Sequence, residues 1–207
     1  MSDPKPDIFV YKMTTDNGGA PCVFNNLLSL AICKPRIRKR ADIGALVFGF
    51  GGQAYQERLL YIARITDKKV GPVYYQLPEF SSRPDCIYQV VGGRAELKAS
   101  AKYHFDSDQR KRDVGTNFDC ASVLLSKDFR YLGREGTDAY KLRYPHLRVL
   151  IEGLRQGHRR NHPSGLRAEL LELKEEVLEK NRKMNVGMPS DNDCTRRCNY
   201  ESPCIIC

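Results

Sequence analysis

The sequence lacks any uninterrupted apolar stretch that approaches the ~20 residues needed to cross a bilayer as a helix. Residues 1–7 are polar and contain proline, and no apolar core of a secretory signal peptide follows them. We therefore expect a cytoplasmic protein with no membrane partner. In that compartment the eight cysteines are expected to be thiols or metal ligands rather than disulfides.

Recognised cofactor motifs are also missing. The segment GFGG at residues 49–52 has neither the Lys-Ser/Thr pair of a phosphate loop nor the GxGxxG spacing of a dinucleotide-binding turn. The C-terminal cysteines follow a C-x3-C-x5-C-x2-C spacing that matches no common zinc module and contains no histidine. We expect no cofactor and no metal. These cysteines are Cys194, Cys198, Cys204 and Cys207.

Acidic residues are too few to balance the basic ones. The chain of 207 residues has 34 Lys and Arg against 25 Asp and Glu, which gives a formal net charge of +9. The hydrophobic content of 41% and charged content of 29% are typical of a globular domain. This balance favours a polyanionic partner, either a nucleotide or a nucleic acid, with DNA preferred.

The front half of the chain is rich in strand patterns, whereas the back half has helical ones. Residues 23–33 form an apolar run that is compatible with a short helix or a buried strand, and Pro35 is expected to end it. The segment 81–117 is expected to be mostly loop. Strands are expected at residues 8–13, 45–50, 59–66, 73–77, 86–91 and 122–126, with residues 128–132 as a continuation of the last.

Two apolar series at helical spacing, at 147, 150, 151 and 154 and at 166, 170, 173 and 177, predict a pair of helices. We divide the chain into an α+β domain at residues 1–140, a helical extension packed on it at 141–183, and a flexible cysteine-containing tail at 184–207. The tail shows no apolar periodicity, so its deletion is expected to leave the melting temperature and the nucleic-acid affinity nearly unchanged. The helical extension also offers a surface for a protein partner.

The run KPRIRKR at residues 34–40 has the highest density of cations in the chain. A proline fixes the backbone beside Lys34, and Ile37 would let Arg36 and Arg38 face opposite ways on an extended segment. Such a rigid cationic loop suits phosphate binding, in which arginine binds in a bidentate manner. The alternative is a loop whose charges are simply solvated.

The turn DNGG at residues 16–19 allows two interpretations. Asp16 and Asn17 can cap a glycine turn, or Asp16 can read a base edge or act as an acid or base near Cys22 and Lys34. Cys22 and Cys33 are either small buried hydrophobes or, beside the cations, nucleophiles. His104 is a candidate general base if it lies in a cleft.

Three stretches resemble a known family: TTDNGGAPC, LAICKPRIRKRADIGALVFGFGG and LLYIARITD. They are similar to the nucleotide modification associated domain family, type 2, and ASVLLSKDFRYLG is similar to a later segment of that family. The resemblance covers roughly residues 7–135. Ala45 and Cys22 depart from the family pattern. The family is associated with systems that modify nucleotides or DNA bases in bacteria and phages, so the resemblance implies a role in DNA modification or phage defence.

The strand-rich front half also looks like the small barrels of PUA, ASCH and EVE type, which bind RNA or extruded modified bases.

Three functions follow from these patterns. The first is a binding protein that recognises a modified base or a nucleotide, with ligand contacts at Asn17, Gly18, Gly19, Pro35, Arg36, Arg38, Arg40, Gly49, Gly51 and Gly52. The second is an enzyme acting on a nucleotide or DNA base, with a reactive set of Asp16, Cys22, Lys34 and His104. The third is a basic interaction protein without base recognition, which uses the cations around residues 155–160. In the first two, residues 16–22, 34–38 and 49–52 are expected to converge.

Overall fold

The computed structural model describes residues 5–155 and 157–191 of the chain. They form eleven strands and six α-helices, with the strands concentrated in the first two thirds of the chain, so the α+β class expected from the sequence is confirmed. The strands are β1 (Ile8–Met13), β2 (Cys22–Phe24), β3 (Leu27–Leu30), β4 (Leu46–Gly51), β5 (Leu59–Arg64), β6 (Asp67–Val70), β7 (Tyr88–Val91), β8 (Arg94–Leu97), β9 (Ser122–Ser126), β10 (Asp128–Tyr131) and β11 (His158–Arg159). The helices are α1 (Pro35–Arg40), α2 (Val73–Gln76), α3 (Ser107–Val114), α4 (Tyr140–Arg143), α5 (Pro145–Gly153) and α6 (Ser164–Lys180).

The strands lie in two open sheets and one hairpin. The larger sheet has the order β10-β5-β4-β1-β11, in which β1 and β4 are parallel and the other neighbours antiparallel. The smaller sheet has the order β2-β3-β9-β6, and β7 pairs with β8 alone. Within the described residues these sheets do not close into a barrel, unlike the PUA-type fold that the sequence suggested.

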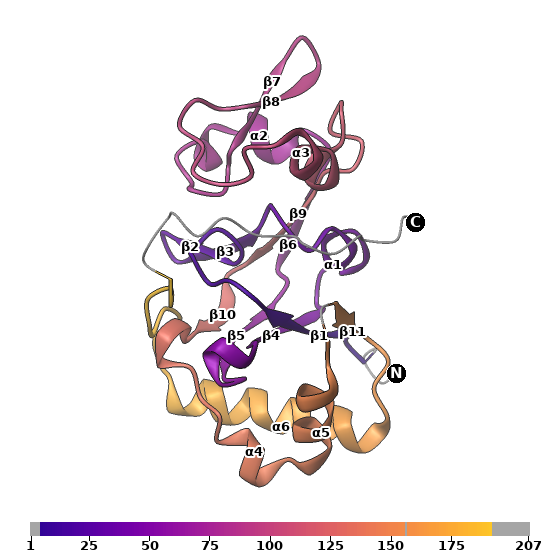
Figure 1. Cartoon of the computed structure of the whole chain (residues 1–207), viewed down its shortest axis with the longest axis vertical. Coiled ribbons are helices and arrows are strands. Elements are labelled where there is room, and N and C mark those ends of the chain that lie inside the picture. The colour runs from indigo at the N-terminus through magenta and orange to yellow at the C-terminus, as the bar shows by residue number, and fades with distance from the viewer. Residues whose placement is uncertain (1–4, 156, 192–207) are drawn as a thin grey trace.

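Figure 1 shows how the layers are stacked. Helices α4, α5 and α6 cover one face of the larger sheet, and the smaller sheet with α1 lies on its other side. The excursion that carries α2, β7, β8 and α3 extends beyond the smaller sheet, at the top of the view. The residues of the site described below come from this excursion, from α1 and the turn before it, and from β11 at the edge of the larger sheet.

Strand β1 shows why the larger sheet is buried on both faces. Ile8 and Val10 pack on the helical side, whereas Phe9 and Tyr11 pack on the side of the smaller sheet. Because successive side chains of a strand point to opposite faces, a continuous apolar run is required here rather than an alternating one. Such runs are the clearest strand signals in the sequence.

The expected strands at 8–13, 45–50, 59–66, 86–91 and 122–126 all correspond to strands of the structure, within two residues at each end. Residues 128–132 were expected to continue the last of these. They form a separate strand, β10, which belongs to the larger sheet while β9 belongs to the smaller one. The hydroxyl of Ser126 accepts a hydrogen bond from the Asp128 amide (3.1 Å) at the point where the chain changes sheets.

Two predicted elements were wrong. Residues 73–77 form one turn of helix, α2, because Pro72 precedes them with φ already at −75° and Tyr74 and Tyr75 turn into an aromatic cluster. Residues 23–33 form neither a helix nor one strand but the hairpin β2–β3. Its turn residues Asn25 and Asn26 have φ of 48° and 56°, which is the conformation of the tight hairpin turns that asparagine favours.

The segment 81–117, expected to be mostly loop, contains β7, β8 and α3. Asp106 caps the start of helix α3, and its carboxylate accepts a hydrogen bond from the Gln109 amide (2.7 Å). The helix has few apolar residues, so apolar periodicity gave no signal for it. Its last turn places Asp113 in the interior, where this residue becomes central to the site.

The last described residues also differ from the flexible tail expected from residue 184. The Met184 carbonyl accepts a hydrogen bond from the Tyr131 amide (2.8 Å), and the Met188 carbonyl accepts one from the Arg134 amide (2.9 Å). The Asp191 amide donates to the Asp16 carbonyl (2.9 Å). Residues 184–191 are thus held along β10 and back to the N-terminal turn. The four C-terminal cysteines lie outside the described residues.

Candidate functional site

The cationic run begins with a tight turn and continues as a helix, not as an extended loop. Cys33 and Lys34 have φ of 57° and 45°, and Pro35 occupies the first position of α1. The fixed φ of proline suits that position, so the residue that was expected to end one element starts another. Arg36 and Arg40 are four positions apart and therefore lie on one face of the helix, and both are exposed.

Arg38 lies on the opposite face and is completely buried. Its Nε donates to the Cys33 carbonyl (2.6 Å), and its guanidinium also donates to the Ser122 carbonyl (2.8 Å) and the Asp113 carbonyl (3.0 Å). An ion pair with the Asp113 carboxylate (3.3 Å) balances its charge. Arg38 therefore fastens α1 to β9 and α3, and the prediction that it faces a ligand from an extended loop does not fit this position.

The exposed cations of α1 face the edge strand β11. Burial lowers the pKa of His158, and the positive charges of Arg40, Arg36 and Lys34 lower it further. A concavity of about 580 Å³ lies here, lined by Arg40, His158, Arg159, Arg160 and Asn161. We call the surface formed by Arg36, Arg40, His158 and Arg159 the α1–β11 surface. The basic residues at 158–160, expected on a helix, thus lie on a strand that pairs with β1 and on the residue after it.

Lys34 connects this surface to the interior of the sheet. Its ammonium lies over the Tyr11 ring, 4.8 Å from the centroid, in a cation–π arrangement. The Tyr11 hydroxyl hydrogen-bonds that of Tyr61 (2.8 Å). Burial raises the pKa of Tyr11, and the negative charges of Cys33 and Asp16 add to the rise, so both of these groups lie within electrostatic range of one ring.

Asp16 is buried and has its oxygens occupied. Its carboxylate accepts hydrogen bonds from the Tyr131 hydroxyl (2.6 Å) and from the amide and hydroxyl of Ser190 (both 3.0 Å). Burial raises the pKa of this carboxyl group, and these hydrogen bonds oppose the rise. In this structure Asp16 holds residues 190–191 against the sheet.

The turn that follows Asp16 packs against the segment that carries His104. The Asn17 side chain accepts a hydrogen bond from the Gly19 amide (3.1 Å), and the Tyr103 hydroxyl donates to the Asn17 carbonyl (3.2 Å). A Cβ on Gly19 would lie 3.1 Å from the Tyr103 ring, so the ring lies directly against the glycine backbone. Gly18 has φ of +80°, which explains glycine there.

The glycines of β4 are explained by packing. A Cβ on Gly49 would lie 2.2 Å from the Tyr61 ring, and one on Gly51 would lie 2.4 Å from Tyr55. Gly52 lies where the chain leaves β4, and its amide donates to the Met13 carbonyl (2.8 Å). These three glycines let aromatic rings and backbone approach β4 closely.

The cysteine that contacts His104 is Cys33, not Cys22. Cys22 is buried in β2, and burial raises the pKa of its thiol. Cys33 is partly exposed, and its Sγ lies 3.2 Å from Nε2 of His104. Nδ1 of His104 hydrogen-bonds the carboxylate of Asp113. A thiol, an imidazole and a carboxylate are thus joined in sequence.

Asp113 also fixes the position of the cysteine itself. One of its oxygens accepts a hydrogen bond from the Cys33 amide (2.8 Å), and the other accepts one from the Tyr88 hydroxyl (2.9 Å) in addition to the His104 contact. Burial alone would lower the pKa of His104, but the bonds to Asp113 and Cys33 raise it to about 10. The imidazole is therefore protonated at neutral pH.

Sequence reasoning named His104 but did not connect it with Cys33 and Asp113. These residues lie 71 and 9 positions away from it, and no linear motif joins them. Of the predicted site, Arg36 and Arg40 lie on one exposed face of α1, Lys34 precedes that helix, and Tyr103 connects the 16–19 turn with the segment of His104. No group of three metal-ligating side chains occurs within residues 5–155 and 157–191. Over the same ranges no helix is long and apolar enough to span a membrane.

Comparison with known proteins identifies the family. No curated protein and no solved structure matches the chain. The family described as "Nucleotide modification associated domain 2" matches residues 5–195, which extends beyond the segment 7–135 that carried the resemblance and includes both long helices. The chain therefore belongs to the nucleotide modification associated domain 2 family.

Proposed function

We propose that the protein binds the phosphates of a nucleotide or nucleic acid, with DNA preferred, at the α1–β11 surface, within a system that modifies or defends DNA. The family places the chain among proteins associated with nucleotide modification. The observation that carries the proposal is the gathering of cations from α1 and β11 around one concavity. Phosphate contacts supply most of the affinity of such surfaces.

The arginines on α1 and β11 are arranged differently from a row of charges that is simply solvated. Among the described residues, Arg40 and Arg159 form no ion pair with a carboxylate, whereas Arg160 pairs with Asp7 (2.7 Å). Guanidinium groups without a carboxylate partner keep all their donors for a bidentate contact with phosphate. Because α1 is anchored from behind by buried Arg38, its exposed face is rigid.

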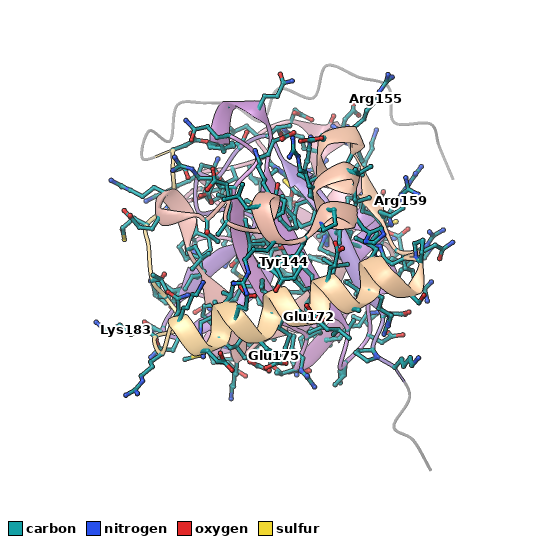
Figure 2. The ribbon with its side chains drawn as sticks, turned by 90° about the horizontal axis from the view of Figure 1, so that it is seen from below. Tyr144, Arg155, Arg159, Glu172, Glu175 and Lys183 are labelled. Atoms are coloured by element: carbon teal, nitrogen blue, oxygen red, sulfur yellow. The ribbon has the colours of Figure 1, made fainter. Side chains whose placement is uncertain are left out.

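The helical end of the molecule has the opposite charge. A concavity of about 510 Å³ beside α6 is lined by Tyr144, Arg143, Leu171 and four glutamates, Glu172, Glu175, Glu176 and Glu179. Figure 2 shows Glu172 and Glu175 on α6 below Tyr144, while Arg155 and Arg159 lie toward another edge of the molecule. This acidic surface would repel a polyanion, so the charge distribution favours binding at the α1–β11 surface.

The residues that bind phosphate in this proposal are Arg36, Arg40 and Arg159, with Lys34 beside them. Asp16, a candidate for reading a base edge on sequence grounds, has its oxygens bonded to Tyr131 and Ser190 and is not part of the proposed surface. The α1–β11 surface is therefore proposed to bind phosphate, and no residue is assigned to base recognition.

The test is the salt dependence of binding to a short duplex and to a single strand of DNA. Arg40→Gln/Arg159→Gln should weaken binding and make the slope of log K against log salt shallower by about two, because each lost phosphate contact releases about one counterion fewer. Arg94→Gln/Arg134→Gln removes the same charge from exposed positions on other elements and should leave the slope unchanged. An equal loss in both double variants would mean that only net charge matters and would overturn the proposal.

A further inference from the structure

We propose that Cys33 and His104 are the catalytic residues of an acyl-transfer site, with Asp113 as the positioning residue, and that the acyl group is carried by a nucleotide. The assignment of a nucleotide rests on the function proposed above. The assignment of the nucleophile does not, because it depends on the geometry around Cys33 alone.

The geometry matches the roles that thiol-based acyl transfer requires. The thiol lies 3.2 Å from one imidazole nitrogen, and the other nitrogen is bonded to a buried carboxylate. A base oriented by a third group, within hydrogen-bond reach of a nucleophile, is the arrangement that defines such sites on unrelated folds. Here one carboxylate holds both the His104 ring and the Cys33 amide, so it fixes the nucleophile and the base relative to each other.

Charge in this cluster favours the reactive form of the sulfur. His104 is positively charged at neutral pH, for the reasons given above, and an adjacent cation stabilises a thiolate. Cys33 is also a partly exposed residue. By contrast, Cys22 and Cys86 are buried, and burial raises the pKa of each thiol, as expected of cysteines with a packing role.

Backbone conformation separates this cluster from a packing contact. Cys33, Lys34 and His104 all have φ between 45° and 57°, a left-handed region that non-glycine residues seldom adopt. Cys33 and His104 belong to the cluster, and Lys34 directly follows Cys33 in the chain. Strain of this kind persists only where surrounding bonds hold it, and here Asp113 supplies them.

The reaction balances without an oxidant or a metal. The Cys33 thiolate attacks the acyl carbon of an ester or amide and forms an S–C bond, and the bond from that carbon to the leaving oxygen or nitrogen breaks. His104 gives its proton to the leaving group. Water then attacks the thioester while His104 accepts a proton from it, the S–C bond breaks, and the thiolate and the imidazolium are restored. The net change is hydrolysis of the acyl group; an amine in place of water would give transfer.

The neighbours of Cys33 indicate the class of substrate. Lys34 follows it directly, and Arg36 and Arg40 lie on the helix that starts two residues later. A substrate whose phosphate binds these cations would place an attached group near the sulfur. We therefore assign the substrate as a nucleotide, free or within DNA, whose base or sugar bears an acyl group.

The nucleophile is tested with p-nitrophenyl acetate, a neutral acyl donor that does not need the cationic surface. The wild-type protein should release a burst of nitrophenolate equal to the protein concentration and carry the acetyl group on the Cys33 peptide. Cys33→Ser should abolish the burst, and His104→Gln should lower the acylation rate by about 100-fold. Cys120→Ser removes an exposed cysteine outside the cluster and should change nothing.

The role of Asp113 is read from a pH profile rather than from activity alone. In the wild-type protein, iodoacetamide should alkylate Cys33 with a rate that is already at its plateau at pH 7, since the thiolate is stabilised. Asp113→Asn should move that profile toward the ordinary thiol pKa of about 8.5. Tyr88→Phe leaves the Asp113 carboxylate in place and should therefore keep the wild-type pH profile of alkylation. Acetylation confined to Cys120, or a wild-type profile with an ordinary thiol pKa, would overturn the proposal.

A second donor separates this inference from the proposed function. O-acetylated thymidine monophosphate should acetylate Cys33, and Arg40→Gln/Arg159→Gln should slow this reaction much more than it slows the reaction with p-nitrophenyl acetate. Suppose that p-nitrophenyl acetate acylates Cys33 but the double arginine variant reacts with the nucleotide donor as fast as the wild-type protein. Cys33 is then the nucleophile, and the assignment of a nucleotide substrate is wrong. If neither donor acylates Cys33, the acyl-transfer site is wrong whatever the DNA-binding result.

Discussion

Gly49 shows how closely single residues are fitted in the larger sheet. The ring of Tyr61 packs against the strand at this position, and its hydroxyl hydrogen-bonds that of Tyr11, whose ring lies under the ammonium of Lys34. The position of these rings therefore depends on glycine having no side chain at position 49, as well as on the groups that are present.

Gly49→Ala should destabilise the protein by about 1–3 kcal/mol, because the new Cβ would lie 2.2 Å from the Tyr61 ring and 2.9 Å from the Met13 sulfur. Gly153→Ala, in α5, is the matched control, since no atom lies within 4 Å of its Cβ position. Urea denaturation measures both. Equal stabilities of the two variants would show that the ring does not depend on this glycine.

His104 should make stability depend on pH. Its pKa is raised to about 10 in the folded protein, so its stabilising contribution is complete below the unfolded value of about 6.5 and is lost as the pH rises through about 10. A change of one pH unit in a pKa corresponds to about 1.4 kcal/mol, so the loss is on the order of a few kcal/mol.

The measurement is the unfolding free energy at several pH values between 6 and 10. The wild-type free energy should fall over this interval, and His104→Gln should show a much smaller fall. His146→Gln, which changes a histidine whose side chain is 66% exposed, should retain the wild-type slope. A wild-type protein with no fall in this interval would contradict the charged state assigned to His104.

At the scale of elements, a buried ionic network holds the β2–β3 hairpin. Arg83 donates to the carbonyls of Phe24 (3.0 Å), Cys22 (3.1 Å) and Leu27 (3.2 Å), and pairs with Asp85 (3.5 Å). Asp85 also accepts hydrogen bonds from the hydroxyls of Ser29 and Tyr74. The hairpin is thus fixed by charges from outside it.

Arg83→Met should destabilise the protein by about 3–5 kcal/mol, because it leaves the Asp85 carboxylate buried without its counter-ion. Arg83→Met/Asp85→Asn should recover part of that loss, since no charge is left unpaired. Arg94→Met removes an exposed arginine from β8 and should have little effect. Thermal or urea unfolding compares the three. A double variant less stable than Arg83→Met would refute the unpaired-charge explanation.

The segment 184–191 gives a second prediction at this scale, which replaces the expectation that residues 184–207 are dispensable. A chain ending at residue 183 should be less stable than one ending at residue 191, because it loses the bonds to Tyr131 and Arg134 and leaves Asp16 without the Ser190 donors. The difference should be about 1–3 kcal/mol, the usual penalty for buried polar groups without partners. Equal melting temperatures of the two chains would contradict it.

The elements also show what sequence patterns could and could not predict. Strands β1, β4, β5 and β9 are apolar runs buried on both faces, and such runs are visible without a structure. Helix α1 was missed because proline ends one helix as readily as it begins another. Helix α3 was missed because so little of its surface is buried.

The site was predictable only in part, for a different reason. The cations of α1 are contiguous in the sequence, so composition alone located them. Cys33 comes just before α1, His104 lies between β8 and α3, and Asp113 belongs to α3, so only tertiary structure brings the three together. The positive charge of Arg38 was equally visible in the sequence. Its burial was not, because it depends on an ion pair with Asp113, 75 residues away.

At the scale of the whole molecule, the two kinds of charge gather on different elements. Cations gather at α1 and at β11, an edge strand of the larger sheet, whereas glutamates gather along α6, which covers one face of that sheet (Figures 1 and 2). A polyanion would approach such a molecule in one preferred orientation. Cys33 directly precedes the turn that starts α1, the helix that carries Arg36 and Arg40, so the proposed chemistry and the proposed binding surface share one element.

The most direct measurement of this account is amide chemical-shift mapping of the labelled protein, titrated with a short single-stranded DNA and with a nucleoside monophosphate. The largest shifts should fall on residues 33–40 and 158–161 and should decrease with added salt. Amides of α6 should remain in place in the same titration. Shifts confined to α6, or to the β7–β8 hairpin, would contradict the claim that the α1–β11 surface binds nucleotide phosphates.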